Sequence, residues 1–211
     1  MIKNIVFDMG GVVVDLKFDQ ALAAFSELGL EHPEDYINPY RQSGLFYKFE
    51  TGTISDEDFV REFSKLTGKE FNLRDTSTAW KSFLDEVKVE RLRYIESLRT
   101  EYKVYMLSNN NSFILNWADT PAFSKDGKPI SAYFDKMYLS YRMHMAKPDR
   151  EIFDAMIADS GVVPKETLFI DDGPKNVEMG RQVGFRVYHA ENGKDWRADI
   201  DEILGRGRSR F

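Results

Sequence analysis

The stretch "IVFDMGGVVVD", residues 5–15, carries an apolar run into an aspartate, Asp8, and then turns through two glycines. Its apolar residues stand next to one another instead of alternating with polar ones, which is typical of a short strand buried on both faces in a parallel sheet. In open parallel sheets, ligand sites lie beyond the carboxyl ends of the strands. Asp8 is therefore the first candidate for a functional residue.

Length and composition indicate a protein with a substantial core. The chain has 211 residues, of which 42% are hydrophobic, enough for one good-sized domain or for a core with a smaller insertion. A formal net charge of -6 argues against a broad nucleic-acid surface, so we expect no nucleic-acid partner. The basic end "GRGRSRF" (205–211) is expected to be a solvated terminus.

Cysteine usage and hydropathy bear on location. The chain has no cysteine, which excludes disulfides and thiolate metal sites and fits a reducing compartment. No apolar run approaches the ~20 residues needed to cross a bilayer, and the N-terminus lacks the profile of a signal peptide. We therefore expect a cytoplasmic protein with no membrane partner.

From about residue 90 onward, helix and strand patterns alternate. The expected strands are "KVYMLSN" (103–109), "KMYLS" (136–140), "ETLFIDD" (166–172) and "FRVYHA" (185–190). The expected helices are "ERLRYIESLRTEY" (90–102), "DREIFDAMIADSG" (149–161) and "NVEMGRQVG" (176–184). Leu92, Ile95 and Leu98 share one face of the first helix, while Asp149 should cap the second and Gly161 should stop it. This alternation predicts βα units, with helices on both faces of a parallel sheet.

The sequence pattern between the first strand and residue 90 is typical of helices. In "SDEDFVREFSKL" (55–66), Ser55 is a plausible N-cap with Asp58 three residues later, and Phe59, Phe63 and Leu66 fall on one helix face. The predicted fold is therefore α/β: a Rossmann-like, three-layer core from residues 1–15 and 90–211, with a helical domain, residues 16–89, inserted into it.

Polar residues gather at the carboxyl ends of the predicted strands: Asp8, Ser108, Asn109, Lys147, Asp171 and Asp172. Closely spaced carboxylates repel one another and are tolerated as anions chiefly when a cation lies between them. Oxygen ligands without a Cys or His cluster suit Mg²⁺, which leaves room for water and a phosphate oxygen. Hydroxyl, backbone N–H and lysine groups can hold the other phosphate oxygens. An ionised Asp8 beside Mg²⁺ and Lys147 could attack phosphorus and form an aspartyl phosphate that water hydrolyses.

Four segments at these positions resemble the motifs of the haloacid dehalogenase (HAD) superfamily of phosphohydrolases. They are "FDMGGVVVD" (7–15), "LSN" (107–109), "KPDREIF" (147–153) and "FIDDGPKN" (169–176), in the order that the superfamily has. The inserted domain matches the place of the small helical cap that covers the site and selects the substrate. Within the superfamily, "FETGTIS" (49–55) and "MLSNNNSF" (106–113) resemble segments of bacterial α-D-glucose-1-phosphate phosphatases.

The resemblance implies a role for each strand-end residue. Asp8 would be the nucleophile and a Mg²⁺ ligand, and Gly10 would offer its backbone carbonyl to the metal. Ser108 and Asn109 would bind the phosphoryl group, and Lys147 would neutralise the nucleophile and the phosphate. Asp172, with Asp171, would complete the metal shell. The expected enzyme is a Mg²⁺-dependent phosphatase that acts on a small phosphate ester, with a sugar phosphate as the favoured class.

One departure from the superfamily concerns position 10. Most of its phosphatases have a second aspartate two residues after the nucleophile as general acid and base, whereas this chain has Gly10. Acid–base help is typically worth ~10²–10⁴-fold in rate, so its loss favours substrates with good leaving groups, such as anomeric sugar phosphates. Asp15 is the nearest other carboxylate in sequence, but its simpler role is to end the loop.

The missing aspartate keeps two alternatives open. One is a protein that binds phosphate ligands or acts as a regulatory module without turnover. The other is a 2-haloacid dehalogenase, which would need no Mg²⁺ and would leave the "FIDD" carboxylates without a purpose. Chain order argues against a receiver domain, because receiver domains place their acidic pair on the first strand.

Further side chains in the insertion are candidates for substrate contact. The aromatic residues could stack on a sugar, although such residues more often form a core: Tyr40, Phe46, Tyr47 and Phe49. Glu50 is a candidate for binding hydroxyl groups. His144 lies close to Lys147 in sequence and is expected to be structural.

Overall fold

The computed structural model describes residues 1–206, so most of the basic C-terminal tail lies outside the described residues. Five parallel strands form one sheet in the order β3-β2-β1-β4-β5. Their bounds are β1 (Asn4–Phe7), β2 (Lys103–Ser108), β3 (Lys136–Leu139), β4 (Thr167–Asp171) and β5 (Arg186–His189). Phe7 lies opposite Met106 on one side and Ile170 on the other, so the carboxyl ends of the three central strands are level.

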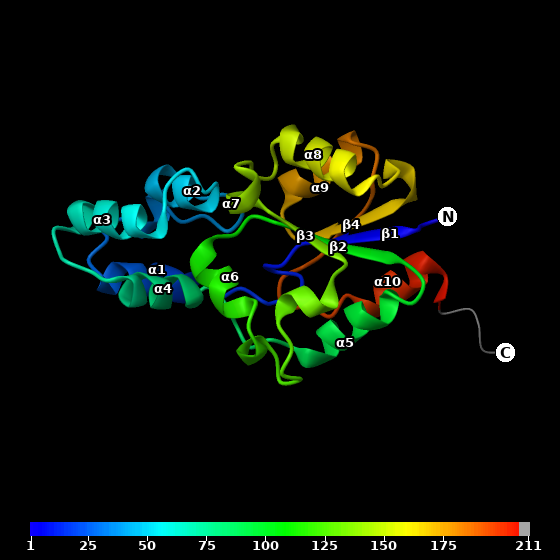
Figure 1. Cartoon of the computed structure of the whole chain (residues 1–211), viewed down its shortest axis with the longest axis horizontal. Helices are drawn as coiled ribbons and strands as arrows, with labels where there is room; N and C mark the ends of the chain where they lie inside the picture. The colour runs from blue at the N-terminus through cyan, green and yellow to red at the C-terminus, as the bar shows by residue number, and fades with distance from the viewer. Residues whose placement is uncertain (207–211) are drawn as a thin grey trace.

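Helices cover both faces of this sheet, as Figure 1 shows, with α8 and α9 on one side and α5 and α10 on the other. The helices of the core are α5 (Val89–Leu98), α6 (Ser112–Ala118), α7 (Ser140–Met143), α8 (Arg150–Ser160), α9 (Pro174–Gln182) and α10 (Arg197–Leu204). Alternate residues of β1 face opposite sides, because Val6 packs with α8 while Ile5 and Phe7 pack with α5 and α10. This arrangement confirms the predicted three-layer α/β fold.

Four helices inserted after β1 extend away from the sheet (Figure 1), and we call them the cap. They are α1 (Phe18–Glu27), α2 (Gly44–Glu50), α3 (Asp56–Thr67) and α4 (Leu73–Lys81). Short 3₁₀ turns complete the chain at Pro33–Asp35, Pro121–Phe123, Ile130–Tyr133 and Pro164–Glu166. The centre of the cap is aromatic, and the ring centroids of Phe25 and Phe46 lie 4.9 Å apart.

Local signals in the cap behave as expected, with one exception. Ser55 and Asp58 form the predicted capping box at the start of α3, and Phe59 and Phe63 are buried. Leu66 lies on the same helix face but is 44% exposed, so the burial of that face does not extend to the last turn of α3.

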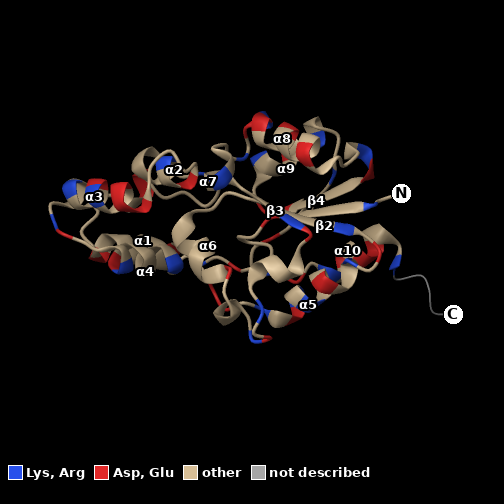
Figure 2. Ribbon diagram, viewed as in Figure 1, with Lys and Arg blue, Asp and Glu red and all other residues tan. Residues whose placement is uncertain are grey.

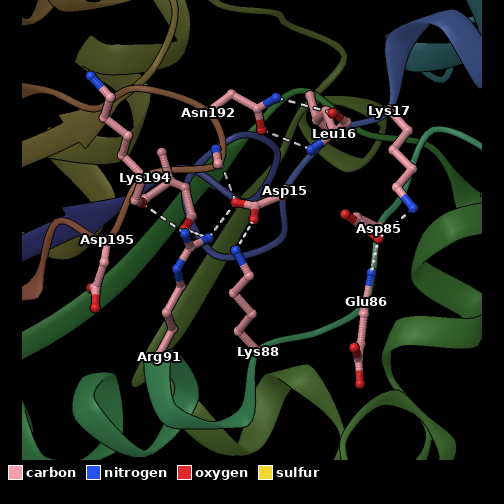
Figure 3. A network of polar contacts seen from close by, with 12 residues as sticks. Asp15, Leu16, Lys17, Asp85, Glu86, Lys88, Arg91, Asn192, Lys194 and Asp195 are labelled. Carbon is pink, nitrogen blue, oxygen red and sulfur yellow. Dashed lines mark hydrogen bonds and ion pairs between the residues drawn. The ribbon is translucent and has the colours of Figure 1, made fainter.

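The two chain segments that join the cap to the core run side by side. Lys17 N–H donates to the Phe83 carbonyl at 2.8 Å, and Asp85 N–H donates to the Asp15 carbonyl at 2.9 Å. The Asp15 carboxylate lies 2.5 Å from Arg91 Nη1 and also pairs with Lys88 (Figure 3). Burial raises the pKa of Asp15, but the hydrogen bonds from these two cations outweigh it, and the pKa is lowered. Asp15 therefore stabilises the junction between the cap and the core.

Charged side chains of both signs are interspersed on the outer helices α3, α5 and α8 (Figure 2). Within residues 1–206, no helix is both long and apolar enough to span a membrane.

The predicted N-terminal capping of α8 by Asp149 is wrong. Asp149 precedes α8, but its side chain makes no capping hydrogen bond. It instead accepts two hydrogen bonds from Arg41 of the segment before α2, at 2.9 and 3.1 Å, because the cap brings that guanidinium within reach.

Candidate active site

A buried lysine joins two aspartates at the carboxyl end of the sheet. Asp8 directly follows β1, and its N–H donates to the Ile170 carbonyl at 2.9 Å, which continues the pairing with β4. Lys147 Nζ lies 3.0 Å from Asp8 Oδ2 and 2.6 Å from Asp171 Oδ2. Lys147 is fully buried, and Asp8 is 8% exposed. The structure therefore brings together three of the residues that the sequence analysis singled out.

Asp171 serves to hold the lysine in place. Its second oxygen, Oδ1, accepts hydrogen bonds from Gly173 N–H at 2.8 Å and Asn176 Nδ2 at 2.9 Å. Both carboxylate oxygens of Asp171 are thus occupied by donors. Asn176 was missed by the sequence analysis, although it ends the "FIDDGPKN" segment, because nothing local shows that the first turn of α9 bends its amide back to Asp171.

Asp172 is the carboxylate best placed for a metal ion. Ligand oxygens of Asp8, Asp171 and Asp172 all lie within 4.8 Å of one another, and Asp172 forms no ion pair within residues 1–206. A Cβ at Gly11 would lie 2.2 Å from Asp172 Oδ2, and Gly11 has a φ of +70°, so only glycine fits there. An all-oxygen donor set without sulfur or imidazole fits Mg²⁺.

Burial and the neighbouring charges shift the pKa values of the titratable groups in this cluster. Burial is the main effect that raises the pKa of Asp8 to about 6, with Lys147 opposing it and Asp171 adding to it. Burial, followed by the charges of Asp8 and Asp171, raises the pKa of Asp172 to about 8. Burial lowers the pKa of Lys147, but the two neighbouring aspartates outweigh it and the pKa is raised, so the lysine stays charged.

Ser108 and Asn109 end β2 beside this cluster. The Ser108 hydroxyl is buried, and as a donor beside Asp8 it lowers the pKa of that carboxyl. The Asn109 amide pairs with the backbone of Lys147: its Oδ1 accepts from Lys147 N–H at 2.8 Å, and its Nδ2 donates to the Lys147 carbonyl at 2.9 Å. The observed role of the Asn109 side chain is therefore to position the lysine, and its contact with a phosphoryl group stays a prediction.

A pocket lies above the cluster, between the core and the cap. The core contributes Asp8, Gly10, Asn109, Lys147, Asp172 and Asn176, and the cap and its junctions contribute Leu16, Tyr40, Gln42, Glu50, Trp80 and Phe83, among others. Tyr40 and Glu50 thus reach the pocket as the sequence analysis considered, whereas Phe46 and Phe49 lie in the cap core. Trp80 was missed. Its ring is buried, yet its indole N–H has no hydrogen-bond partner among the described residues.

The raised pKa values predict how metal binding depends on pH. Because the pKa values of Asp8 and Asp172 exceed the unfolded value of ~4, the metal-free protein loses stability as pH rises through about 6 and then about 8. Mg²⁺ must displace these protons, so its affinity should rise about tenfold per pH unit between pH 6 and 8. Calorimetric titration would measure the slope.

Asp172→Asn provides the matched control for that titration. It removes the group that titrates near pH 8, so the variant should bind Mg²⁺ weakly and without a slope between pH 6 and 8. The same metal affinity in the variant as in the wild-type chain would mean that Asp172 is no ligand. A flat wild-type profile would instead mean that the metal-free carboxyls are already ionised.

The chain is similar in sequence to known hydrolases. The family model for haloacid dehalogenase-like hydrolases matches residues 2–184. The chain is 47% identical over 204 residues to the D-ribitol-5-phosphate phosphatase of Bacteroides thetaiotaomicron, covering 97% of this chain and 99% of that protein. It is 24% identical over 202 residues to a chloroplast flavin mononucleotide hydrolase of Arabidopsis thaliana, covering 94% of this chain and 76% of that protein.

Solved structures show the same fold. A predicted HAD-like family hydrolase from Porphyromonas gingivalis superimposes with a TM-score of 0.93 at 40% identity, with 100% of both chains covered. A HAD family enzyme of Bacteroides thetaiotaomicron in complex with magnesium has a TM-score of 0.86 at 34% identity, covering 94% of this chain and 98% of that chain. An aspartate-to-alanine mutant of that enzyme was solved with magnesium and inorganic phosphate.

Proposed function

This chain belongs to the haloacid dehalogenase-like hydrolases, and we propose that it hydrolyses the terminal phosphate ester of a small sugar alcohol, D-ribitol 5-phosphate or a close analogue. The predicted enzyme class, a magnesium-dependent phosphatase, is confirmed by the family, by the phosphatase relative and by the magnesium complex of a similar enzyme. The predicted α-D-glucose-1-phosphate specificity and the cytoplasmic location stay predictions.

One observation carries the substrate class. The 47% identity to D-ribitol-5-phosphate phosphatase extends over 97% of the chain, so it includes the cap as well as the core. The cap lines the pocket above Asp8, where the organic part of a substrate must lie.

The proposed reaction has two steps at Asp8. A carboxylate oxygen of Asp8 attacks phosphorus, and the bond from phosphorus to the substrate oxygen breaks, which leaves an aspartyl phosphate. Water then attacks phosphorus, and the Asp8 carboxylate is released with inorganic phosphate. Lys147 balances the charge of Asp8 and the phosphoryl group, and Asp171 and Asn109 hold Lys147 in position. Mg²⁺, held by Asp8 and Asp172, would stabilise the charge of the phosphoryl oxygens.

A panel of phosphate esters tests the substrate. With Mg²⁺, we expect kcat/KM for D-ribitol 5-phosphate to exceed that for α-D-glucose 1-phosphate by about tenfold or more, a difference of about 1.4 kcal/mol in transition-state binding. Flavin mononucleotide belongs in the panel because it carries the same ribityl phosphate with a large ring attached. Phosphate release is the measurement.

Each outcome of the panel assigns the substrate. A preference for α-D-glucose 1-phosphate would reject the sugar alcohol and favour the anomeric ester that the absence of a carboxyl at position 10 first indicated. No release from any ester, with Mg²⁺ bound, would reject turnover and favour the alternative of a phosphate-binding module. A 2-haloacid dehalogenase would release halide in the absence of Mg²⁺.

A further inference from the structure

Glu50 is a buried carboxyl of the cap that faces the reacting end of the pocket. It is the last residue of α2 and is 7% exposed. Its side chain lines the same pocket as Asp8 and Lys147, and within residues 1–206 it makes neither a hydrogen bond nor an ion pair. The carboxyl thus faces the pocket without a partner in the packed core, which favours a role in the reaction over a role in packing.

The core holds the backbone of Glu50 in place. Ser140, which follows β3, donates its hydroxyl hydrogen to the Glu50 carbonyl at 2.6 Å. The next residue, Thr51, has its carbonyl 3.1 Å from His144 Nδ1. Gly52 has a φ of +61°, and a Cβ there would lie 2.0 Å from the Tyr141 carbonyl oxygen, so only glycine permits this approach. These contacts hold the main chain of residues 50–52 on residues 140–144 and leave the Glu50 carboxyl to the pocket.

The proposed substrate needs a proton that no residue near Asp8 in sequence supplies. The leaving group of a sugar-alcohol phosphate is a primary alkoxide, which departs poorly unless it is protonated. Position 10 is glycine, and Asp15 is held by Arg91 and Lys88 in the junction. Burial, followed by the charge of Asp8, raises the pKa of Glu50 to about 8, so the carboxyl retains a proton at neutral pH.

We propose that Glu50 is the general acid and general base of the reaction, in the role that a carboxyl at position 10 would otherwise have. The inference rests on the proposed phosphatase function. As Asp8 attacks, the phosphorus–oxygen bond to the substrate breaks, and the Glu50 proton passes to the leaving oxygen, which gives the alcohol. Glu50, now a carboxylate, takes a proton from the water that attacks the aspartyl phosphate. Inorganic phosphate and the Asp8 carboxylate result, and Glu50 is protonated again.

The test compares Glu50→Gln with the wild-type chain on alkyl and aryl phosphates. The change keeps the size of the side chain and removes the transferable proton. For D-ribitol 5-phosphate and simple alkyl phosphates, kcat/KM should fall by about 10²–10⁴-fold. For p-nitrophenyl phosphate, whose leaving group needs no proton, kcat/KM should fall by less than about tenfold. Its kcat should still fall because water attack is slowed, so nitrophenol should appear as a burst equal to the enzyme concentration.

Controls separate this inference from the substrate assignment. Glu57→Gln, an exposed change on α3, should leave every rate unchanged. An equal loss of kcat/KM for alkyl and aryl esters without a burst would overturn the role of Glu50, as would a change in KM alone. If the wild-type chain hydrolyses alkyl phosphates other than D-ribitol 5-phosphate, only the substrate assignment fails, because the comparison of leaving groups still applies. If the wild-type chain hydrolyses no ester, both proposals fall.

Discussion

The Asp8→Asn variant should lose phosphatase turnover by about 10⁴-fold or more and keep its fold. A carboxamide has the shape of the carboxylate but is a far weaker nucleophile, so the aspartyl phosphate cannot form. Lys147 retains Asp171 at 2.6 Å, and the buried ammonium is not left alone. Burial already raises the pKa of Asp8 to about 6, so a neutral side chain should not lower the free energy of unfolding at pH 7.

Phosphate release in the presence of Mg²⁺ and thermal unfolding of the same samples check this expectation. Asp19→Asn, an exposed change in the first turn of α1, is the matched control and should behave as the wild-type chain. Residual hydrolysis within about tenfold of wild type would assign the nucleophile to another residue. Loss of activity together with a large drop in unfolding temperature would contradict the expected stability and make Asp8 a structural residue as well.

The parts of the site on the sheet could be predicted because register constrains them. Asp8, Ser108 and Asp171 each end a short apolar run, and level parallel strands place such ends at one edge. Lys147 could be added because it follows the predicted strand at residues 136–140. The fold was predictable because each strand and three of the core helices, α5, α8 and α9, are marked by a local pattern, whereas α6, α7 and α10 were not predicted.

The remaining interactions depend on how the cap meets the core, which no local pattern records. The pairing of Asp149 with Arg41 replaces the helix cap that the sequence predicts, because a segment 108 residues away lies within hydrogen-bond distance. The unpartnered indole N–H of Trp80 is likewise visible only once the pocket is formed. Glu50 was considered for hydroxyl binding, but the Ser140 contact that holds it above the strand ends joins residues 90 positions apart.

Lys147→Met should destabilise the protein strongly in a way that depends on pH. Methionine replaces the buried stem with an apolar chain of similar length, but Asp8 and Asp171 then face each other without a cation. Breaking a buried ion pair on one side typically costs about 3–5 kcal/mol of unfolding free energy. Urea unfolding of the metal-free protein near pH 8 is the measurement. Lys125→Met, which breaks the exposed pair with Glu86, should cost less than about 1 kcal/mol.

The pH dependence of the unfolding free energy shows why Lys147→Met should destabilise the protein. Lys147 has the largest effect among the groups that lower the pKa of Asp8, so its removal should raise that pKa above about 6. A carboxyl whose folded pKa lies above its unfolded value contributes stability below ~4 that is lost as pH rises through the folded pKa. The difference in unfolding free energy between the variant and the wild-type chain should therefore be small near pH 4.5 and grow toward pH 8. If this difference in unfolding free energy is the same at both pH values, the loss of stability comes from packing, because a cavity or a steric misfit does not titrate.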